Sequence, residues 1–164
     1  MNLLVANYDY GLKANSGETK SKDQIIEMLK NGPVTNCSIT EPFKCENLSI
    51  GKMEFNGVEF LEDFSLTSLA DNNSIIFEDC VFHKSAVLLN INNSKIIFTK
   101  CKFKDHFEMF KSKTETIELS RNSHYSDANL SSVKANELSV LFVQMKKNST
   151  MKLKDSTFKM ISYY

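Results

Sequence analysis

Apolar residues recur along most of this chain at a fixed spacing. The segment IIFEDCVF at residues 75–82 is followed 21 residues later by IIFTKCKF at 96–103, and the two share five of eight residues. Repetition at a constant period is typical of a solenoid, in which each copy is one structural unit stacked on the next. The pattern therefore predicts stacked coils of β-structure.

Aligning the rest of the chain on these two segments extends the repeat over residues 32–164. Each elementary unit has five residues, an apolar pair separated by one residue and then two outward residues, and four units plus one extra residue make a coil. Six coils then begin near Gly32, Met53, Ile75, Ile96, Ile117 and Leu138, with one additional residue before Ile75 and one after Met145. Vertical columns stay apolar in this register, for example Val34, Phe55, Phe77, Phe98, Leu119 and Val140.

Residues 1–31 do not follow the repeat and form a separate N-terminal part. Ser21 and Gln24 have the spacing of a capping box, in which each side chain accepts a hydrogen bond from the other residue's backbone. The apolar residues Ile25, Ile26, Met28 and Leu29 follow, and Asn31-Gly-Pro33 is a typical helix end. Since the first coil of a solenoid otherwise exposes its core, we expect a short capping helix here.

The repeat resembles the pentapeptide-repeat family in its F-x-x-C-x-F steps at 77–82 and 98–103 and in M-x-F-x-x-V-x-F at 53–60. The resemblance covers about residues 32–164. It implies a right-handed, four-sided parallel β-helix, so the expected fold is an all-β solenoid of about six coils with a short N-terminal capping helix. Two features depart from the family. Its coil is one residue shorter, and it favours Asp or Asn where this chain has Glu59, Val81, Lys102 and Ser123.

Composition narrows the possible functions. The chain has 164 residues, which suits a single domain, and its 20 basic residues balance its 20 acidic ones. No apolar run approaches the length of about 20 residues needed for a membrane span. Cys37, Cys45, Cys80 and Cys101 form no CxxC pair, and none combines with a histidine at the spacing of a zinc site. We expect a cytoplasmic protein with reduced thiols, no membrane contact, and no metal or cofactor.

The extra residue of each coil falls at the same corner and builds a polar ridge, which we call the corner ridge. One of its columns reads Asp63, Ser85, His106 and Asp127, which places residue types of a catalytic triad in vertical order. A straight ladder on a convex corner lacks a pocket, so a solvated polar ladder is the favoured interpretation. The alternative is a β-helix enzyme or glycan binder that uses Asp63, His106 and Asp127.

Two inward positions are polar, Asn122 and His124, in columns otherwise filled by Cys80 and Phe82 or their equivalents. Buried polar groups are normally hydrogen-bonded. Either these residues bond to the ladder and to a neighbour such as Tyr125, or the register loosens there. A satisfied core histidine is the favoured interpretation.

The two halves of the rod differ in net charge. Residues 36–99 carry a net charge of −5 and residues 100–164 one of +5. The basic set comprises Lys100, Lys102, Lys104, Arg121, Lys146 and Lys147 together with Tyr125, and it falls on neighbouring outward columns. The acidic set comprises Glu59, Glu62, Glu78 and Asp79. The basic set is suited to phosphate or to an acidic protein surface, and the competing interpretation is a solvated lysine-rich face.

Several outward positions are apolar. Val87, Leu89 and Phe110 cluster on one side, and Leu141 and Phe142 point outward near the C-terminal end. Groups of this kind suggest contact with residues 1–10 folded back as an extended piece, with a second copy, or with a partner. For apolar contacts with a second copy, through the C-terminal end, or with a partner we select Phe110, Leu141, Phe142, Tyr163 and Tyr164.

The favoured function is a non-enzymatic protein that binds a macromolecule through its β-helix faces, most simply a protein partner. In the resembling family, some members inhibit or protect nucleic-acid enzymes such as DNA gyrase by mimicking duplex DNA. That role goes with a strongly acidic rod, so the neutral balance argues against mimicry along the full length. A small phage or bacterial inhibitor, or a modulator of a nucleic-acid-handling enzyme complex, fits the pattern. Direct nucleic-acid binding by the basic set is the alternative.

Overall fold

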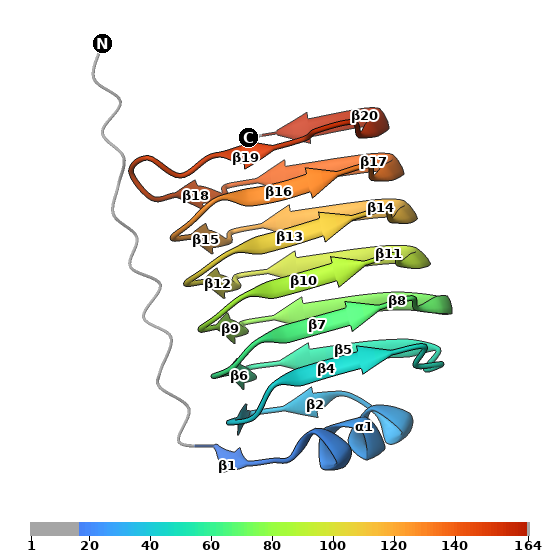
Figure 1. The fold of residues 1–164 in the computed structure, drawn as a ribbon, viewed down its shortest axis with the longest axis vertical. Coiled ribbons are helices and arrows are strands. Elements are labelled where there is room, and N and C mark those ends of the chain that lie inside the picture. The colour runs from blue at the N-terminus through green and yellow to red at the C-terminus, as the bar shows by residue number, and fades with distance from the viewer. Residues whose placement is uncertain (1–16, 164) are drawn as a thin grey trace.

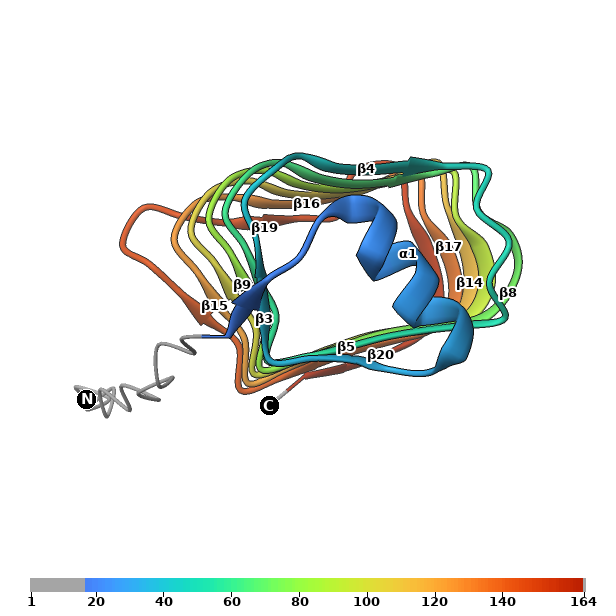
Figure 2. The same cartoon turned by 90° about the horizontal axis from the view of Figure 1, so that it is seen from below.

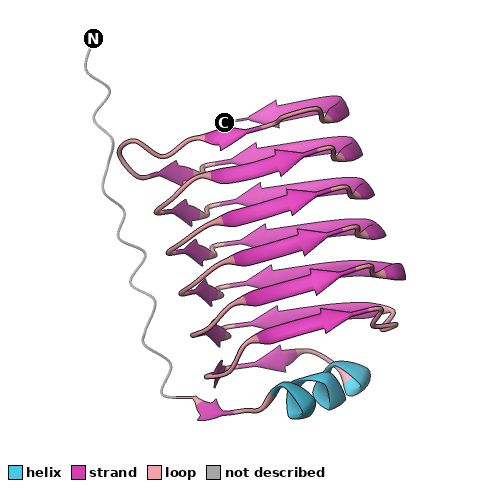
Figure 3. Ribbon diagram, viewed as in Figure 1, coloured by secondary structure: helices cyan, strands magenta, loops and turns pink. Residues whose placement is uncertain are grey.

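The computed structural model describes residues 17–163, without the side chains of residues 70–73. The extended piece expected at residues 1–10 and Tyr164 therefore lie outside the described residues. The described chain forms a parallel β-solenoid of about seven turns with one helix at its N-terminal end (Figure 1 and Figure 3).

Three parallel sheets run along the rod, named here by their strands. The short-strand sheet contains β1 (Glu18–Thr19), β3 (Cys37–Ile39), β6 (Glu59–Phe60), β9 (Val81–Phe82), β12 (Lys102–Phe103), β15 (Ser123–His124) and β18 (Gln144–Met145). The middle sheet contains β4 (Phe43–Glu46), β7 (Phe64–Thr67), β10 (Ala86–Leu89), β13 (Phe107–Phe110), β16 (Ala128–Ser131) and β19 (Met151–Lys152). The long-strand sheet contains β2 (Val34–Thr35), β5 (Lys52–Asn56), β8 (Ala70–Glu78), β11 (Asn92–Thr99), β14 (Lys113–Ser120), β17 (Lys134–Leu141) and β20 (Thr157–Tyr163).

Seen along its axis, the solenoid has a four-sided outline built from these three sheets, because the long-strand sheet continues around one corner (Figure 2). From the N-terminal end the chain turns clockwise as it recedes from the viewer, so the coil is right-handed (Figure 2). The expected all-β, right-handed, four-sided parallel solenoid is thus confirmed. The rod has about seven turns instead of six because β20 pairs with β17 and adds one more level.

Two corners of each coil turn through a residue in the left-handed backbone region. One such column contains Asn36, Gly57, Asp79, Lys100, Arg121 and Phe142, and the other contains Asn47, Ser68, Asn90, Lys111, Ser132 and Asp155. Each φ in these two columns lies between 48° and 64°. Asn, Asp and Gly tolerate this conformation well, whereas side chains such as Phe142 are strained in it.

The core is a set of stacked columns, as the register predicted. Phe60, Phe82 and Phe103 lie parallel with ring centroids 4.9 Å apart at each step, and Phe55, Phe77 and Phe98 form a second stack. Each aromatic contact adds about 0.5–1.5 kcal/mol to the stability from buried area. The repeated apolar columns therefore explain both the shape and the cohesion of the rod.

The N-terminal end is covered by α1 (Lys22–Asn31), which crosses the opening of the first coil (Figure 2). Ser21 Oγ accepts a hydrogen bond from the Gln24 backbone N–H, and Gln24 Oε1 accepts one from the Ser21 N–H at 2.8 Å. The helix buries Ile25 and Leu29 against the first coil. The predicted capping box and capping helix are both present. This α1 cannot cross a bilayer, and the described residues contain no other helix.

The opposite end is open. Ile161 and Tyr163 occupy the columns of Leu138 and Val140, as the repeat predicts, but no described residue covers them. Ile161 is 49% and Tyr163 78% exposed. The last coil also contains two extra residues after Met145, where one was expected, because Ala128 pairs with Met151 while His124 pairs with Met145. These residues form a loop that projects from the corner ridge (Figure 1 and Figure 2).

Candidate functional site

The outer side of the short-strand sheet, with its two bordering corners, brings most of the basic set together. Strand pairing aligns Lys102 with Ser123 and Ser123 with Gln144. Three consecutive coils therefore present rows of three outward positions about 4.8 Å apart along the rod. These rows are Lys100, Lys102 and Lys104, then Arg121, Ser123 and Tyr125, then Phe142, Gln144 and Lys146, and we call them the short-strand face.

Phe142 stands out on this face. Its φ of 54° is in the left-handed region, where an ordinary side chain costs about 1–2 kcal/mol. The same residue is 64% exposed, so burial offsets little of that cost. Its column holds Asn36, Gly57 and Asp79 in earlier coils, which are residue types suited to the turn. An exposed aromatic ring in a strained corner has no evident role in the stability of the isolated rod.

Tyr125 is the second exposed aromatic residue on the face, at 43%. Lys146 Nζ lies 4.6 Å from the centroid of its ring, a cation–π contact worth about 0.5–1 kcal/mol at an exposed site. The contact joins the β15 coil to the projecting loop after β18.

The positive charges of the basic set differ in how far they are neutralised. Lys100 Nζ lies 3.7 Å from both Glu78 Oε1 and Asp79 Oδ2, so its charge is shared with the coil below. Within residues 17–163 no carboxylate lies within ion-pair distance of Lys102, Lys104, Arg121, Lys146 or Lys147. Five cations of the basic set thus remain available to a partner.

The acidic set does not form a free surface. Glu78 and Asp79 face Lys100, Glu62 is bonded to Lys84, and Glu59 Oε2 lies 3.6 Å from His83 Nε2. Burial, followed by the nearby Lys104, lowers the pKa of His83, and Glu59 opposes this shift. The predicted acidic half of the rod is therefore largely paired with neighbouring basic side chains.

The corner ridge carries a Ser–His contact, but not between the Ser85 and His106 of one column. Ser126 Oγ, not Ser85, lies 3.3 Å from His106 Nδ1. Asp127 instead accepts hydrogen bonds from Thr150 N at 2.8 Å and Lys152 Nζ at 2.7 Å, which lower the pKa of its carboxyl group to about 2. Asp127 therefore anchors the projecting loop and does not orient His106.

Asp63 lies 3.7 Å from Lys44 Nζ, again on the ridge. A hydrolytic triad needs a carboxylate on the second imidazole nitrogen and a site for the developing oxyanion. In the described part of the ridge, neither Asp63 nor Asp127 is hydrogen-bonded to His106. The ridge is a polar ladder with local ion pairs.

The described residues also offer no assembled metal site, since no three His, Cys, Asp or Glu side chains among them converge. All four cysteines are free and buried. Burial is the main cause that raises the pKa of the Cys101 thiol well above its usual value, which keeps the thiol protonated and unreactive.

The two inward polar residues behave differently from each other. Asn122 Oδ1 accepts a hydrogen bond from Cys101 N at 2.8 Å, and its Nδ2 donates to Phe98 O at 2.9 Å. His124 has no hydrogen-bond partner on either ring nitrogen and stacks on Phe103 instead. The expectation of a satisfied core histidine is wrong, because the imidazole fills a phenylalanine position in an apolar column.

The outward apolar residues differ in how far they are exposed. Val87, Leu89, Phe110 and Leu141 are half-buried in their sheets and present little exposed surface. The large hydrophobic side chains that are exposed within residues 17–163 are Tyr125, Phe142, Leu153, Met160, Ile161 and Tyr163. All but Tyr125 belong to the last two coils, so the exposed apolar surface is concentrated towards the open end.

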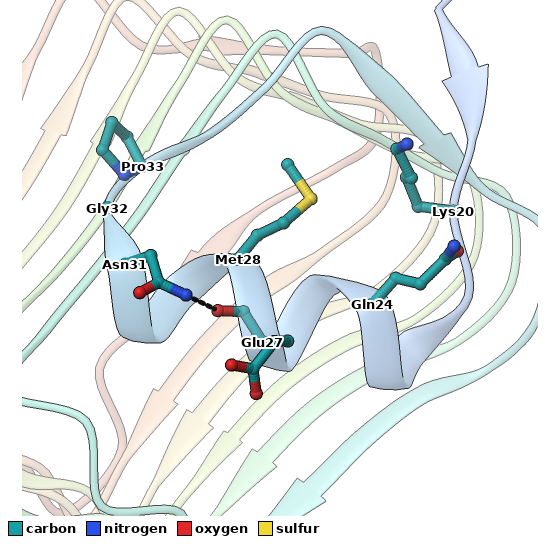
Figure 4. Close-up of a pocket in the computed structure, with 7 residues that line it drawn as sticks. All are labelled: Lys20, Gln24, Glu27, Met28, Asn31, Gly32 and Pro33. Atoms are coloured by element: carbon teal, nitrogen blue, oxygen red, sulfur yellow. Dashed lines mark hydrogen bonds between the residues drawn. The ribbon is translucent and has the colours of Figure 1, made fainter.

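A pocket of about 550 Å³ lies at the other end of the rod, beside α1 (Figure 4). It is lined by Lys20, Gln24, Glu27, Met28, Asn31, Gly32 and Pro33. The repeat does not predict this pocket, because the pocket arises where a helix covers the first coil. The helical segment with Ile25, Ile26, Met28 and Leu29 is the one sequence signal near it.

Comparisons with protein-family models, with curated proteins and with solved structures found no match to this chain.

Proposed function

We propose that this chain is a non-enzymatic binding protein whose short-strand face docks on an acidic surface of a protein partner. Phe142 is the observation that carries the proposal. Its exposed ring occupies a strained corner in a column that begins with Asn36, Gly57 and Asp79, which tolerate that conformation. Strain that persists without a gain in stability is often associated with function.

The chemistry of the face supports a protein partner. Protein interfaces are enriched in aromatic residues and arginine, and Phe142, Tyr125 and Arg121 stand together on this face. Lys102, Lys104 and Lys146 lie beside them without a carboxylate partner among the described residues, and they would steer an acidic partner into contact. The flat solenoid side provides a rigid surface that loses little entropy on binding.

The partner class implied by the resemblance, a nucleic-acid-handling enzyme complex that the chain inhibits or modulates, is part of this proposal. The pairing of Glu78, Asp79 and Glu62 with lysines favours an acidic partner over mimicry of nucleic acid by this chain. We also propose that the chain is a divergent pentapeptide-repeat protein. The inward positions of Phe77, Cys80 and Phe82 in a right-handed four-sided coil support that relationship.

A second partner is proposed for the open end, namely another copy of this chain. The support is the exposure of Ile161 and Tyr163, which occupy core columns, and the outer edge of β20, with which no described strand pairs. Unpaired strand edges with exposed apolar residues favour pairing with another chain.

Site-specific photo-crosslinking in cells tests the proposed face. A benzophenone amino acid replaces Phe142 in one variant and Lys95, exposed on the long-strand sheet, in the control. We expect a protein adduct at position 142 that disappears in the Lys102→Glu, Arg121→Glu background. The adduct should persist with Lys113→Glu, Lys134→Glu, which makes the same charge change on the long-strand sheet.

Equal adducts at both positions, or none at position 142, would contradict the proposal. A salt-dependent gel shift with DNA or RNA oligonucleotides that is lost in the Lys102→Glu, Arg121→Glu variant would instead establish nucleic-acid binding by the same face.

A further inference from the structure

The cap at the N-terminal end covers the first coil but leaves a hollow beside α1. Helix α1 buries Ile25 and Leu29, while Met28 on its flank is only partly buried. In Figure 4 the Met28 side chain points into the space between α1 and the chain segments on either side of it. This space is the pocket of about 550 Å³ that Lys20 and Pro33 also line.

The chain that precedes the described residues joins the rod beside this pocket. Gly17 packs against the backbone of Asn36, where a Cβ atom would lie 2.2 Å from the Asn36 carbonyl oxygen. The next residues form β1 on the outer edge of the short-strand sheet, and Lys20, immediately after β1, lines the pocket. Residues 1–16 are thus tethered within a few residues of the opening.

The sequence of that segment matches the chemistry of the pocket. Residues 1–10 read MNLLVANYDY, with one charged side chain and six large apolar or aromatic ones. Residues 11–16 separate them from Gly17 and span up to about 20 Å when extended. A tethered segment also competes well against free ligands, because its effective concentration is in the millimolar range.

We propose that residues 1–10 of the same chain pack into the pocket beside α1 and complete the N-terminal cap. Leu3, Leu4 and Val5 supply the apolar side chains that contact Met28 and Pro33. This role is independent of the short-strand face, which lies on the side of the rod.

Paramagnetic NMR on the full chain tests this contact. A nitroxide label is attached to cysteine in Ala6→Cys, since the four native cysteines are buried, and the chain carries ¹³C-methyl methionine. The Met28 signal is assigned by its loss in Met28→Leu. We expect the label to abolish the Met28 methyl signal and to leave Met160, at the open end, unchanged.

Two variants of the labelled chain provide the comparison. Leu3→Ser, Leu4→Ser should restore the Met28 signal, whereas Asn2→Ser, Asn7→Ser should not. The buried Met109 methyl reports that each variant remains folded. An unaffected Met28 signal in the labelled chain overturns the proposal. So does broadening of Met28 in a mixture of spin-labelled and separately ¹³C-labelled molecules, which would assign the pocket to a second copy.

Discussion

The imidazole of His124 stacks on the ring of Phe103, with centroids 4.6 Å apart and the planes within 7° of parallel. The imidazole of His124 also makes a tilted contact with the ring of Phe107, with centroids 5.9 Å apart. His124 therefore continues the aromatic column of Phe60, Phe82 and Phe103 with a side chain that can be protonated. Because neither nitrogen has a partner, the charged form has no compensating interaction in the core.

This position makes stability depend on pH. Burial lowers the pKa of His124 from 6.5 to about 4 in the folded chain, so the unfolded chain binds the proton more readily. Its contribution is fully present above about pH 6.5 and is lost as pH falls towards 4. We expect a loss of about 2–3 kcal/mol between pH 7.5 and 4.5 from this residue. Urea unfolding at the two pH values measures it.

The variant His124→Phe provides the comparison, since Phe already occupies the positions below in the column. The variant should lose this part of the pH dependence and should be more stable than the native chain at pH 7.5, because two unpartnered polar atoms are removed. Other groups titrate in both proteins, so the difference between them isolates His124. An identical pH dependence in the two proteins would contradict the assignment.

Substitutions at Asn122 distinguish the contribution of its hydrogen bonds to stability from that of its packing. Asn122→Ala removes the hydrogen bonds to the buried Cys101 N–H and to Phe98 C=O, which should lower the free energy of unfolding by about 2–4 kcal/mol. Asn122→Cys restores the residue type of this column, where Cys101 Sγ lies 3.5 Å from Phe77 O. Its loss should be clearly smaller. Equal losses by urea denaturation would show that the side-chain bonds contribute little.

The residues that the sequence predicted well are those set by the repeat. The column that runs from Val34 to Val140 has an apolar residue in every coil, so its members could be placed from the spacing alone. The partners of outward charges depend on rotamers and on corner geometry, which spacing does not show. Lys100 was therefore assigned to a free basic set although it faces Glu78 and Asp79. The left-handed corner under Phe142 carried no sequence signal, because Phe is an atypical residue there.

Phe142 itself yields a prediction in which stability and binding change in opposite directions. Phe142→Asn places a residue that tolerates the left-handed region in the same column as Asn36. We expect a gain of about 0.5–1 kcal/mol in the free energy of unfolding, together with weaker capture of the protein partner. Phe142→Tyr keeps the ring and the strain, so it should change neither quantity. A Phe142→Asn variant that is less stable would show that the ring supports the fold.

The open end leads to the last prediction, which concerns self-association. If a second copy covers the uncapped columns, Ile161→Asp places a charge in the contact and should weaken association at least about tenfold. Ser162→Asp adds the same charge to the neighbouring residue of β20, whose side chain points to the other face of the sheet. It should leave association intact. Sedimentation velocity over a range of protein concentrations distinguishes these outcomes. If the native chain stays monomeric at every concentration, the proposal of self-association through β20 is wrong. The proposal that the short-strand face binds a protein partner is unaffected by that result.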